Sequence, residues 1–161
     1  MAKIEAQLEK LGLVLPGPLV LPPGTAMPIS FVRITGNHAY ISGHVPQQPD
    51  GSIAEPMGKL GKELTVEQGY EAAKLVALSM LASLKRELGD LDRVTKWLKV
   101  LGMVNCDPAF KATPQVINGF SELIVELYGH EVGTHARSAV GMAALPGNVP
   151  VEIEAEAEIA L

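Results

Sequence analysis

The chain has 161 residues, of which 47% are hydrophobic and 19% charged, and its formal net charge is −5. This length allows one domain with its own core, which we expect to span residues 1–161. Nucleic-acid binding depends on clustered Lys and Arg. Because the densest basic pair is Lys85 with Arg86, we expect no nucleic-acid partner. A small anion held by one arginine is compatible with this charge.

Two further features of the composition concern location and assembly. Cys106 is the only cysteine, which excludes an internal disulfide and favours a cytoplasmic location. The first ten residues are charged and lack the apolar centre of a secretory signal. No run approaches the roughly 20 apolar residues that span a bilayer, so we expect no membrane partner. The mean hydropathy of +0.21 then suggests that apolar surface is buried between subunits.

The N-terminal part of the chain predicts a short helix and an extended arm. Residues 2–11 carry apolar side chains at helical spacing. Five prolines follow within residues 13–28, and they exclude a helix or a central strand. Residues 1–28 are therefore predicted to form a helix and a proline-rich arm that lies against the protein body. The core is predicted to begin at residue 29.

Strands and helices are mixed in the predicted core. Two strands are expected over residues 29–34 and 39–45, around a Gly-Asn turn. The best helix spans residues 65–88 and begins with a capping box formed by Thr65 and Gln68. A strand is predicted over residues 94–106 and a second long helix over residues 113–129, where a Thr-Pro pair favours helix initiation.

The stretch 136–159 is predicted to be two strands joined by a turn. Its second half alternates strictly between apolar residues and four glutamates, so one face must be buried. The resulting order is β-β-α-β-α-β-β after an N-terminal helix. This order predicts an α+β fold in which two main helices cover one face of a single mixed β-sheet.

Four short motifs suggest a family. They are ISGHVP at residues 41–46, ARSAV at 136–140, LP at 145–146 and VEIEA at 151–155. This combination resembles the RidA/YjgF family of reactive-intermediate deaminases, also called endoribonuclease L-PSP, from about Ile29 to the end of the chain. The last three motifs are fairly specific at this spacing, whereas ISG alone is weak. The N-terminal helix and the longer middle segment resemble a longer subgroup.

The resemblance implies a chorismate-mutase-like fold, a homotrimer and a pocket at each subunit interface. It also implies hydrolysis of enamines and imines of 2-oxo acids, such as 2-aminoacrylate, to the oxo acid and ammonia, with no metal or organic cofactor. By motif position, Arg137 would hold the carboxylate of the small metabolite, Glu152 would orient the hydrolytic water, and Gly43 would supply a backbone contact. Asn118 matches an asparagine that the family often has in its second helix.

The chain departs from the family pattern at two positions. Members usually carry Gly-Pro-Tyr-Ser near the N-terminus, whereas Gly17-Pro18 is followed here by Leu19-Val20. The cysteine often found two residues after the arginine is Ala139. The carboxylate anchor and the glutamate are thus kept, while the rest of the pocket is altered.

Each main candidate also has a simpler interpretation. Arg137 by itself fits a surface arginine or a salt bridge within a trimer, and only the motif around it favours a ligand. Glu152 by itself fits one of four solvated strand glutamates. We accept that interpretation for Glu156 and Glu158, and Glu154 remains open between the two.

The histidines and the cysteine give weaker signals. His130 and His135 lack the i, i+4 spacing of a helical zinc site, so no metal site is expected. His44 follows Gly43 and is expected at the hairpin surface rather than in the pocket. Cys106 has no visible base beside it and is expected to be a small buried side chain.

A plain hairpin over residues 136–159 constrains the pocket. Turning about Gly147-Asn148, it would place Arg137 opposite about Glu158, and Arg137 and Glu152 would lie roughly 20 Å apart along the ladder. One subunit's hairpin cannot then bring both into one small pocket. Either the chain departs from a plain hairpin, or Glu152 comes from a neighbouring subunit.

Three functions remain in order of preference. The first is a hydrolase of 2-imino or 2-enamino acids. The second is a trimeric protein that binds a small carboxylate without turnover, which the missing tyrosine favours. The third is ribonuclease activity, ranked last because the acidic balance offers RNA no phosphate track.

Overall fold

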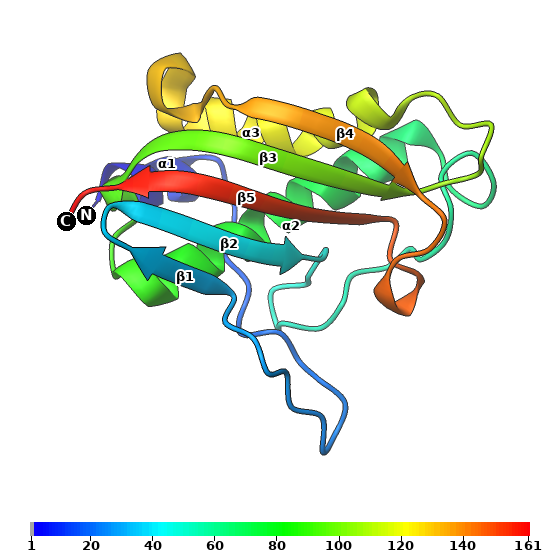
Figure 1. Ribbon diagram of the computed structural model, residues 1–161, viewed down its shortest axis with the longest axis horizontal. Coiled ribbons are helices and arrows are strands. Elements are labelled where there is room, and N and C mark those ends of the chain that lie inside the picture. Colours follow the sequence, from blue (N-terminus) through cyan, green and yellow to red (C-terminus); the bar gives the residue numbers. More distant parts are fainter. Residues whose placement is uncertain (1) are drawn as a thin grey trace.

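A five-stranded mixed sheet with helices on one face organises the computed structural model, which describes residues 2–161 (Figure 1). The strand order is β1-β2-β5-β3-β4. The strands are β1 (Val32–Thr35), β2 (His38–His44), β3 (Val94–Asn105), β4 (Ala136–Met142) and β5 (Val151–Ile159). The helices are α1 (Lys3–Lys10), α2 (Val66–Leu88) and α3 (Thr113–Gly133), with short 3-10 turns at Leu91–Arg93 and Pro146–Asn148. The predicted α+β order is confirmed.

The alternating strand β5 lies at the centre of the sheet. It pairs antiparallel with β2 on one side and with β3 on the other. Its apolar residues, such as Val151 and Ile153, have no exposed surface and face the helices, while its glutamates face the opposite side. Because every second residue of a strand points the same way, this one strand defines a covered face and an open face of the sheet.

Helices α2 and α3 form the layer behind the sheet (Figure 1). The expected capping box at Thr65 and Gln68 begins α2. A Cβ at Gly119 of α3 would overlap the Tyr70 carbonyl of α2, and one at Gly102 of β3 would overlap Ile117 of α3. Because Gly119 and Gly102 carry no side chain, α3 can pack closely on α2 and on β3. None of the helices within residues 2–161 combines the length and apolar composition needed to cross a bilayer.

The predicted hairpin over residues 136–159 is wrong. Strand β3 lies between β4 and β5, pairing parallel with β4 and antiparallel with β5. The chain between them does turn, but it connects strands two positions apart, and β4 becomes the edge of the sheet. The physical reason is long-range pairing: β3 supplies a 12-residue partner that both strands can use along their length.

The proline-rich arm follows the body of the protein for only part of its length. Leu13 and Leu15 pack against the core, as expected. The backbone amides of Gly17 and Val20 donate to the loop after β2, and the chain then extends away from the sheet before it returns to β1 (Figure 1). Val20, Met27 and Ile29 have exposed side chains, so the expectation that the arm lies against the body holds only for its first part.

Candidate functional site

Arg137 and Asn118 lie together on the covered side of the sheet. Arg137 is paired with Val100 of β3, which is fully buried under the helices, so its side chain points toward α3. Its Nη1 donates to Asn118 Oδ1 at 2.8 Å and to Ser121 Oγ at 3.1 Å. Both contacts use Nη1, which leaves the Nε and Nη2 edge without a partner among residues 2–161. That edge can grip a carboxylate with two parallel hydrogen bonds.

The charge of Arg137 is not neutralised within residues 2–161. The three ion pairs found there involve other residues, and both acceptors of Arg137 are neutral. The guanidinium is therefore held in place by neutral side chains at the edge strand of the sheet. Two of the predicted site residues, Arg137 and Asn118, are thus in direct contact.

Ser121 and His135 complete this group, although no motif in the sequence points to either of them. His135 Nδ1 lies 2.7 Å from the Gly133 carbonyl, so it carries the proton and donates. Its Nε2 then accepts from Ser121 Oγ at 2.9 Å. Burial holds the pKa of His135 below its usual range, the Gly133 contact opposes this, and the charge of Arg137 lowers it further. The neutral His135 ring thus orients the Ser121 hydroxyl, which accepts a hydrogen bond from Arg137.

Gly43 and Glu152 form a second pair, on the open side of the sheet. Gly43 lies in an irregular segment of β2 between Ile41 and His44, where the pairing with β5 shifts register. A Cβ built at Gly43 would overlap the Glu152 carboxylate and lie 3.0 Å from its Cδ. Only glycine leaves room for the carboxylate above the backbone at this point.

Burial raises the pKa of Glu152, and the neighbouring charge of Glu154 raises it further. The half-buried carboxylate makes no hydrogen bond with residues 2–161. A carboxylate with a raised pKa and no hydrogen-bond partner is suited to accept and return a proton.

The two pairs lie on opposite sides of one sheet. Arg137 shares a register with Val100 and Ala155, whereas Glu152 shares one with Met103 and Val140. This offset of three residues along the strands and two strands across corresponds to about 14 Å between the Cα atoms of Arg137 and Glu152. The chain departs from a plain hairpin, yet a single copy still does not bring the two residues into one pocket.

Comparison with known proteins decides the family. Residues 6–158 match the profile of the family described as "YjgF/chorismate_mutase-like, putative endoribonuclease". The chain belongs to the YjgF/chorismate-mutase-like family. The resemblance drawn from the four motifs is confirmed, as is the fold.

Three relatives cover nearly the whole chain of this YjgF-family protein. Protein TCP17 from Trypanosoma cruzi is 39% identical over 157 residues, covering 98% of this chain and 94% of its own. The structure of Atu1372 from Agrobacterium tumefaciens, of unknown function, is 39% identical with a TM-score of 0.86, covering 99% and 93%. A structure named as a putative endoribonuclease from Shewanella oneidensis is 29% identical with a TM-score of 0.85, covering 98% and 99%.

His44 was expected at the hairpin surface, and that expectation is wrong. Its side chain is 3% exposed because the irregular segment of β2 turns it toward α2. Its Nδ1 donates to the Ser42 carbonyl at 2.6 Å, and its Nε2 accepts from Ser83 Oγ at 2.8 Å. Burial lowers the pKa of His44 to about 4, so the ring is neutral. It anchors the backbone beside Gly43 to α2.

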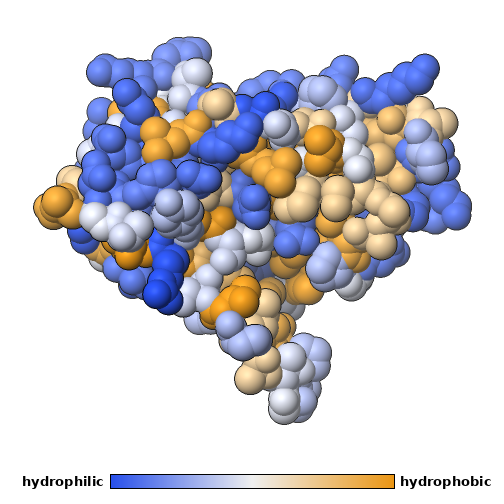
Figure 2. Space-filling view, in the orientation of Figure 1, coloured by the Kyte–Doolittle hydropathy of each residue, from blue (hydrophilic) through white to orange (hydrophobic). Residues whose placement is uncertain are grey.

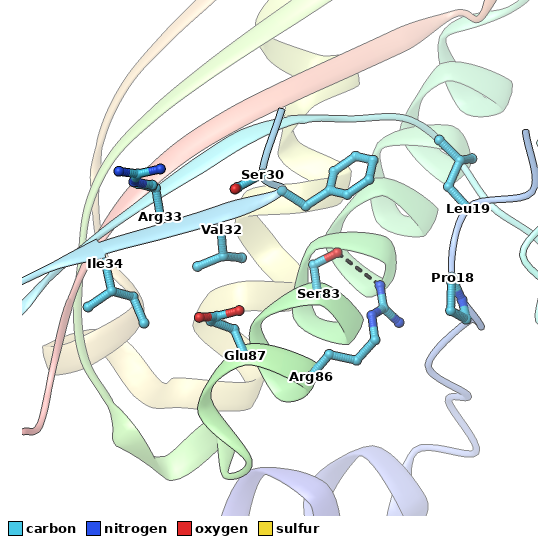
Figure 3. Close-up of a pocket in the computed structure, with 10 residues that line it drawn as sticks. Pro18, Leu19, Ser30, Val32, Arg33, Ile34, Ser83, Arg86 and Glu87 are labelled. Atoms are coloured by element: carbon cyan, nitrogen blue, oxygen red, sulfur yellow. Dashed lines mark hydrogen bonds between the residues drawn. The ribbon is translucent and has the colours of Figure 1, made fainter. Parts of the chain in front are cut away.

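A cavity of about 540 Å³ lies between β1 and the C-terminal half of α2, and none of the four predicted site residues lines it. Figure 3 shows Arg86 reaching from α2 toward Pro18, with its Nη2 donating to Ser83 Oγ at 3.0 Å. The carboxylate of Glu87 lines the same space. Arg86 thus orients the Ser83 hydroxyl, which in turn donates a hydrogen bond to His44.

One group of carboxylates within residues 2–161 is close enough to suggest a cation. Glu5, Asp90 and Asp92 place oxygens within 4.8 Å of one another. Their roles are structural, however. Asp92 accepts from the first backbone amides of α1, Asp90 caps the 3-10 turn at residues 91–93, and Glu5 pairs with Lys85.

Proposed function

We propose that this protein hydrolyses 2-imino and 2-enamino acids, such as 2-aminoacrylate, in a pocket shared by two copies of the chain. One copy would supply Arg137 and Asn118 from its edge strand and α3. The other would supply Gly43 and Glu152 from its open face. The observation that carries the proposal is the separation of these two pairs on opposite sides of one sheet. The pair with Arg137 can bind a carboxylate and the pair with Glu152 can transfer protons, and the reaction needs both.

The reaction needs little from the protein beyond positioning. An enamine first tautomerises to the imine, and water then adds to the imine carbon. Glu152 would pass one proton of that water to the imine nitrogen, which gives a carbinolamine. It would then move the hydroxyl proton of the carbinolamine to the same nitrogen, so that the C–N bond breaks, ammonia leaves and the carbon becomes the carbonyl of a 2-oxo acid. Positioned proton transfer of this kind contributes roughly 10²–10⁴-fold. The backbone of Gly43 would lie beside the reacting carbon.

Recognition of the substrate would rest on Arg137. Its free Nε and Nη2 edge suits the carboxylate that all 2-imino acids share. Asn118 and Ser121 fix the guanidinium plane from the other side, so little side-chain entropy would be lost on binding.

The open face of the sheet supports assembly into a homotrimer. Figure 2 shows hydrophobic residues gathered across the middle and right of this face, beside a hydrophilic left part. Val140 and Tyr40 are exposed there. Apolar side chains on an unpaired sheet face favour burial against another copy, which would bring a second chain next to Glu152.

The test is release of ammonia from imines that an amino-acid oxidase generates in situ. We expect Arg137→Ala to lower kcat/KM by about 10²–10⁴-fold, because two charge-assisted hydrogen bonds are lost. Glu152→Gln should lower kcat by about 10²–10⁴-fold. Arg33→Ala is the matched control, since Arg33 is an exposed arginine of β1. Full activity of Arg137→Ala would contradict the assigned site.

A second candidate is a protein that binds a small carboxylate without turnover. The position of the family's pocket tyrosine holds Leu19, which lines the space beside Glu152 and offers no hydroxyl. A bound 2-oxo acid together with no ammonia release would favour this function. Ribonuclease activity, as in the family description, is the weakest candidate because the net charge of −5 opposes a polyanion.

A further inference from the structure

A cavity of about 220 Å³ adjoins Glu152 and Gly43, and its walls are mostly apolar. Its apolar lining comes from two sources, the proline-rich arm and the segments around β2. These residues are Leu19, Leu21, Met27, Phe31, Val45 and Ile53. A substrate held with its reacting carbon near Glu152 would place its side chain against this lining.

The polar side chains in the cavity wall have their donors already committed. His44 donates to the Ser42 carbonyl. The amide nitrogen of Gln47 donates to the carbonyls of Gly17 and Gly51 at 3.4 and 3.2 Å. The remaining charged group is the Glu152 carboxylate. The cavity thus offers no free side-chain donor to an anionic group and repels one through Glu152.

The arm that closes the cavity is fixed rather than loosely placed. Gly17 donates to the Pro49 carbonyl and Val20 to the Gly51 carbonyl, each at 3.0 Å. Gly51 has a φ of +89°, and a Cβ there would overlap the Pro18 carbonyl. The loop after β2 therefore needs glycine to accept the arm this closely. The wall formed by Leu19 and Leu21 is built into the fold.

We propose that this cavity selects 2-imino acids with apolar, branched aliphatic side chains over the small 2-aminoacrylate type and over acidic ones. The inference rests on the proposed function for the placement of the reacting carbon at Glu152. The physical reason is that each added methylene finds apolar surface in a preformed cavity, which is worth up to about 10–200-fold in discrimination.

Binding of stable 2-oxo acids tests this without requiring turnover. Dissociation constants of the full-length protein for pyruvate, 4-methyl-2-oxopentanoate and 2-oxoglutarate can be measured by calorimetry. We expect 4-methyl-2-oxopentanoate to bind about 10–100-fold more tightly than pyruvate, and 2-oxoglutarate to bind more weakly than 4-methyl-2-oxopentanoate. Equal affinities, tightest binding of 2-oxoglutarate, or no binding of any of the three would overturn the inference.

Two arm variants sharpen the result. Met27→Lys places a cation at the cavity wall and should raise the affinity for 2-oxoglutarate relative to 4-methyl-2-oxopentanoate. Val20→Lys adds the same charge to the same exposed arm, away from the cavity lining, and should leave the ratio unchanged. An equal response of both variants would place the selecting surface elsewhere.

Turnover separates this inference from the proposed function. If 4-methyl-2-oxopentanoate binds best but no imine is hydrolysed, hydrolysis fails as the function and the selectivity stands. If imines derived from alanine and leucine are hydrolysed with equal kcat/KM, the function stands and the selectivity is overturned.

Discussion

The Glu152 carboxylate occupies the space that a side chain at residue 43 would need. Gly43 and Glu152 lie on the neighbouring strands β2 and β5, at the register shift between Ile41 and His44. Because Gly43 has no side chain, the Glu152 carboxylate can lie against the backbone at this point. This relationship links the ISG motif to the VEIEA motif, more than one hundred residues later in the chain.

Gly43→Ala should displace the Glu152 carboxylate while the sheet persists. Inserting one methyl group into a packed site typically costs about 1–3 kcal/mol of stability. We expect kcat for imine hydrolysis to fall by about 10²-fold or more, whereas binding of a 2-oxo acid through Arg137 is reduced far less. Ser42→Ala at the preceding, half-buried position is the control. A Gly43→Ala variant with unchanged kcat would show that Glu152 does not act from its observed position.

The acidic limb of the pH–activity profile should report Glu152. Burial and then the charge of Glu154 raise the pKa of Glu152, so a base that works as carboxylate loses activity as the pH falls through that raised pKa. Glu154→Gln removes one of the two causes and should move the acidic limb to lower pH. Glu158→Gln, farther along the same strand face, should leave the limb in place. An acidic limb that moves equally in both variants would contradict this assignment.

Much of the fold was accessible from local patterns. The strict alternation of β5 and the capping box of α2 are each set by residues within one element, and the structure confirms both. These features depend on side-chain periodicity and on backbone hydrogen bonds near a helix end, which a sequence displays directly.

The remaining features depend on long-range pairing that local patterns do not contain. Nothing in residues 136–159 indicates that β3 would insert between β4 and β5. The burial of His44 follows from a register shift and from Ser83, which lies 39 residues away. Ser121 and His135 were missed for the same reason. A Ser-to-His contact between a helix and the start of a strand becomes visible only once α3 is packed behind β4.

Mixing two inactive variants should restore activity if the pocket is shared between copies. Arg137→Ala keeps Glu152, and Glu152→Gln keeps Arg137. In mixed trimers formed from equal amounts, an interface is intact when each copy contributes its unaltered half. Random mixing then predicts about a quarter of wild-type activity. Co-expression with two purification tags provides the mixed species, and ammonia release provides the measurement.

The control for this experiment is the double variant carrying both changes on one chain, mixed with the wild type. It should yield about the same fraction of intact interfaces, because the wild-type copies alone supply them. Recovery no greater than the sum of the two single variants would mean that Arg137 and Glu152 act within one copy or in separate sites.

His44 should make the stability of the protein depend on pH between about 6.5 and 4. In the folded protein burial lowers the pKa of His44 to about 4, whereas in the unfolded chain it lies near 6.5. Between these values the unfolded state binds more protons, so the free energy of unfolding falls as the pH is lowered, by about 3 kcal/mol in total. His135, whose pKa is also lowered, contributes with the same sign. Urea unfolding at pH 7.0, 6.0 and 5.0 measures the slope. His44→Gln removes the titrating group and should flatten it, while an unchanged slope in that variant would assign the pH dependence to other residues.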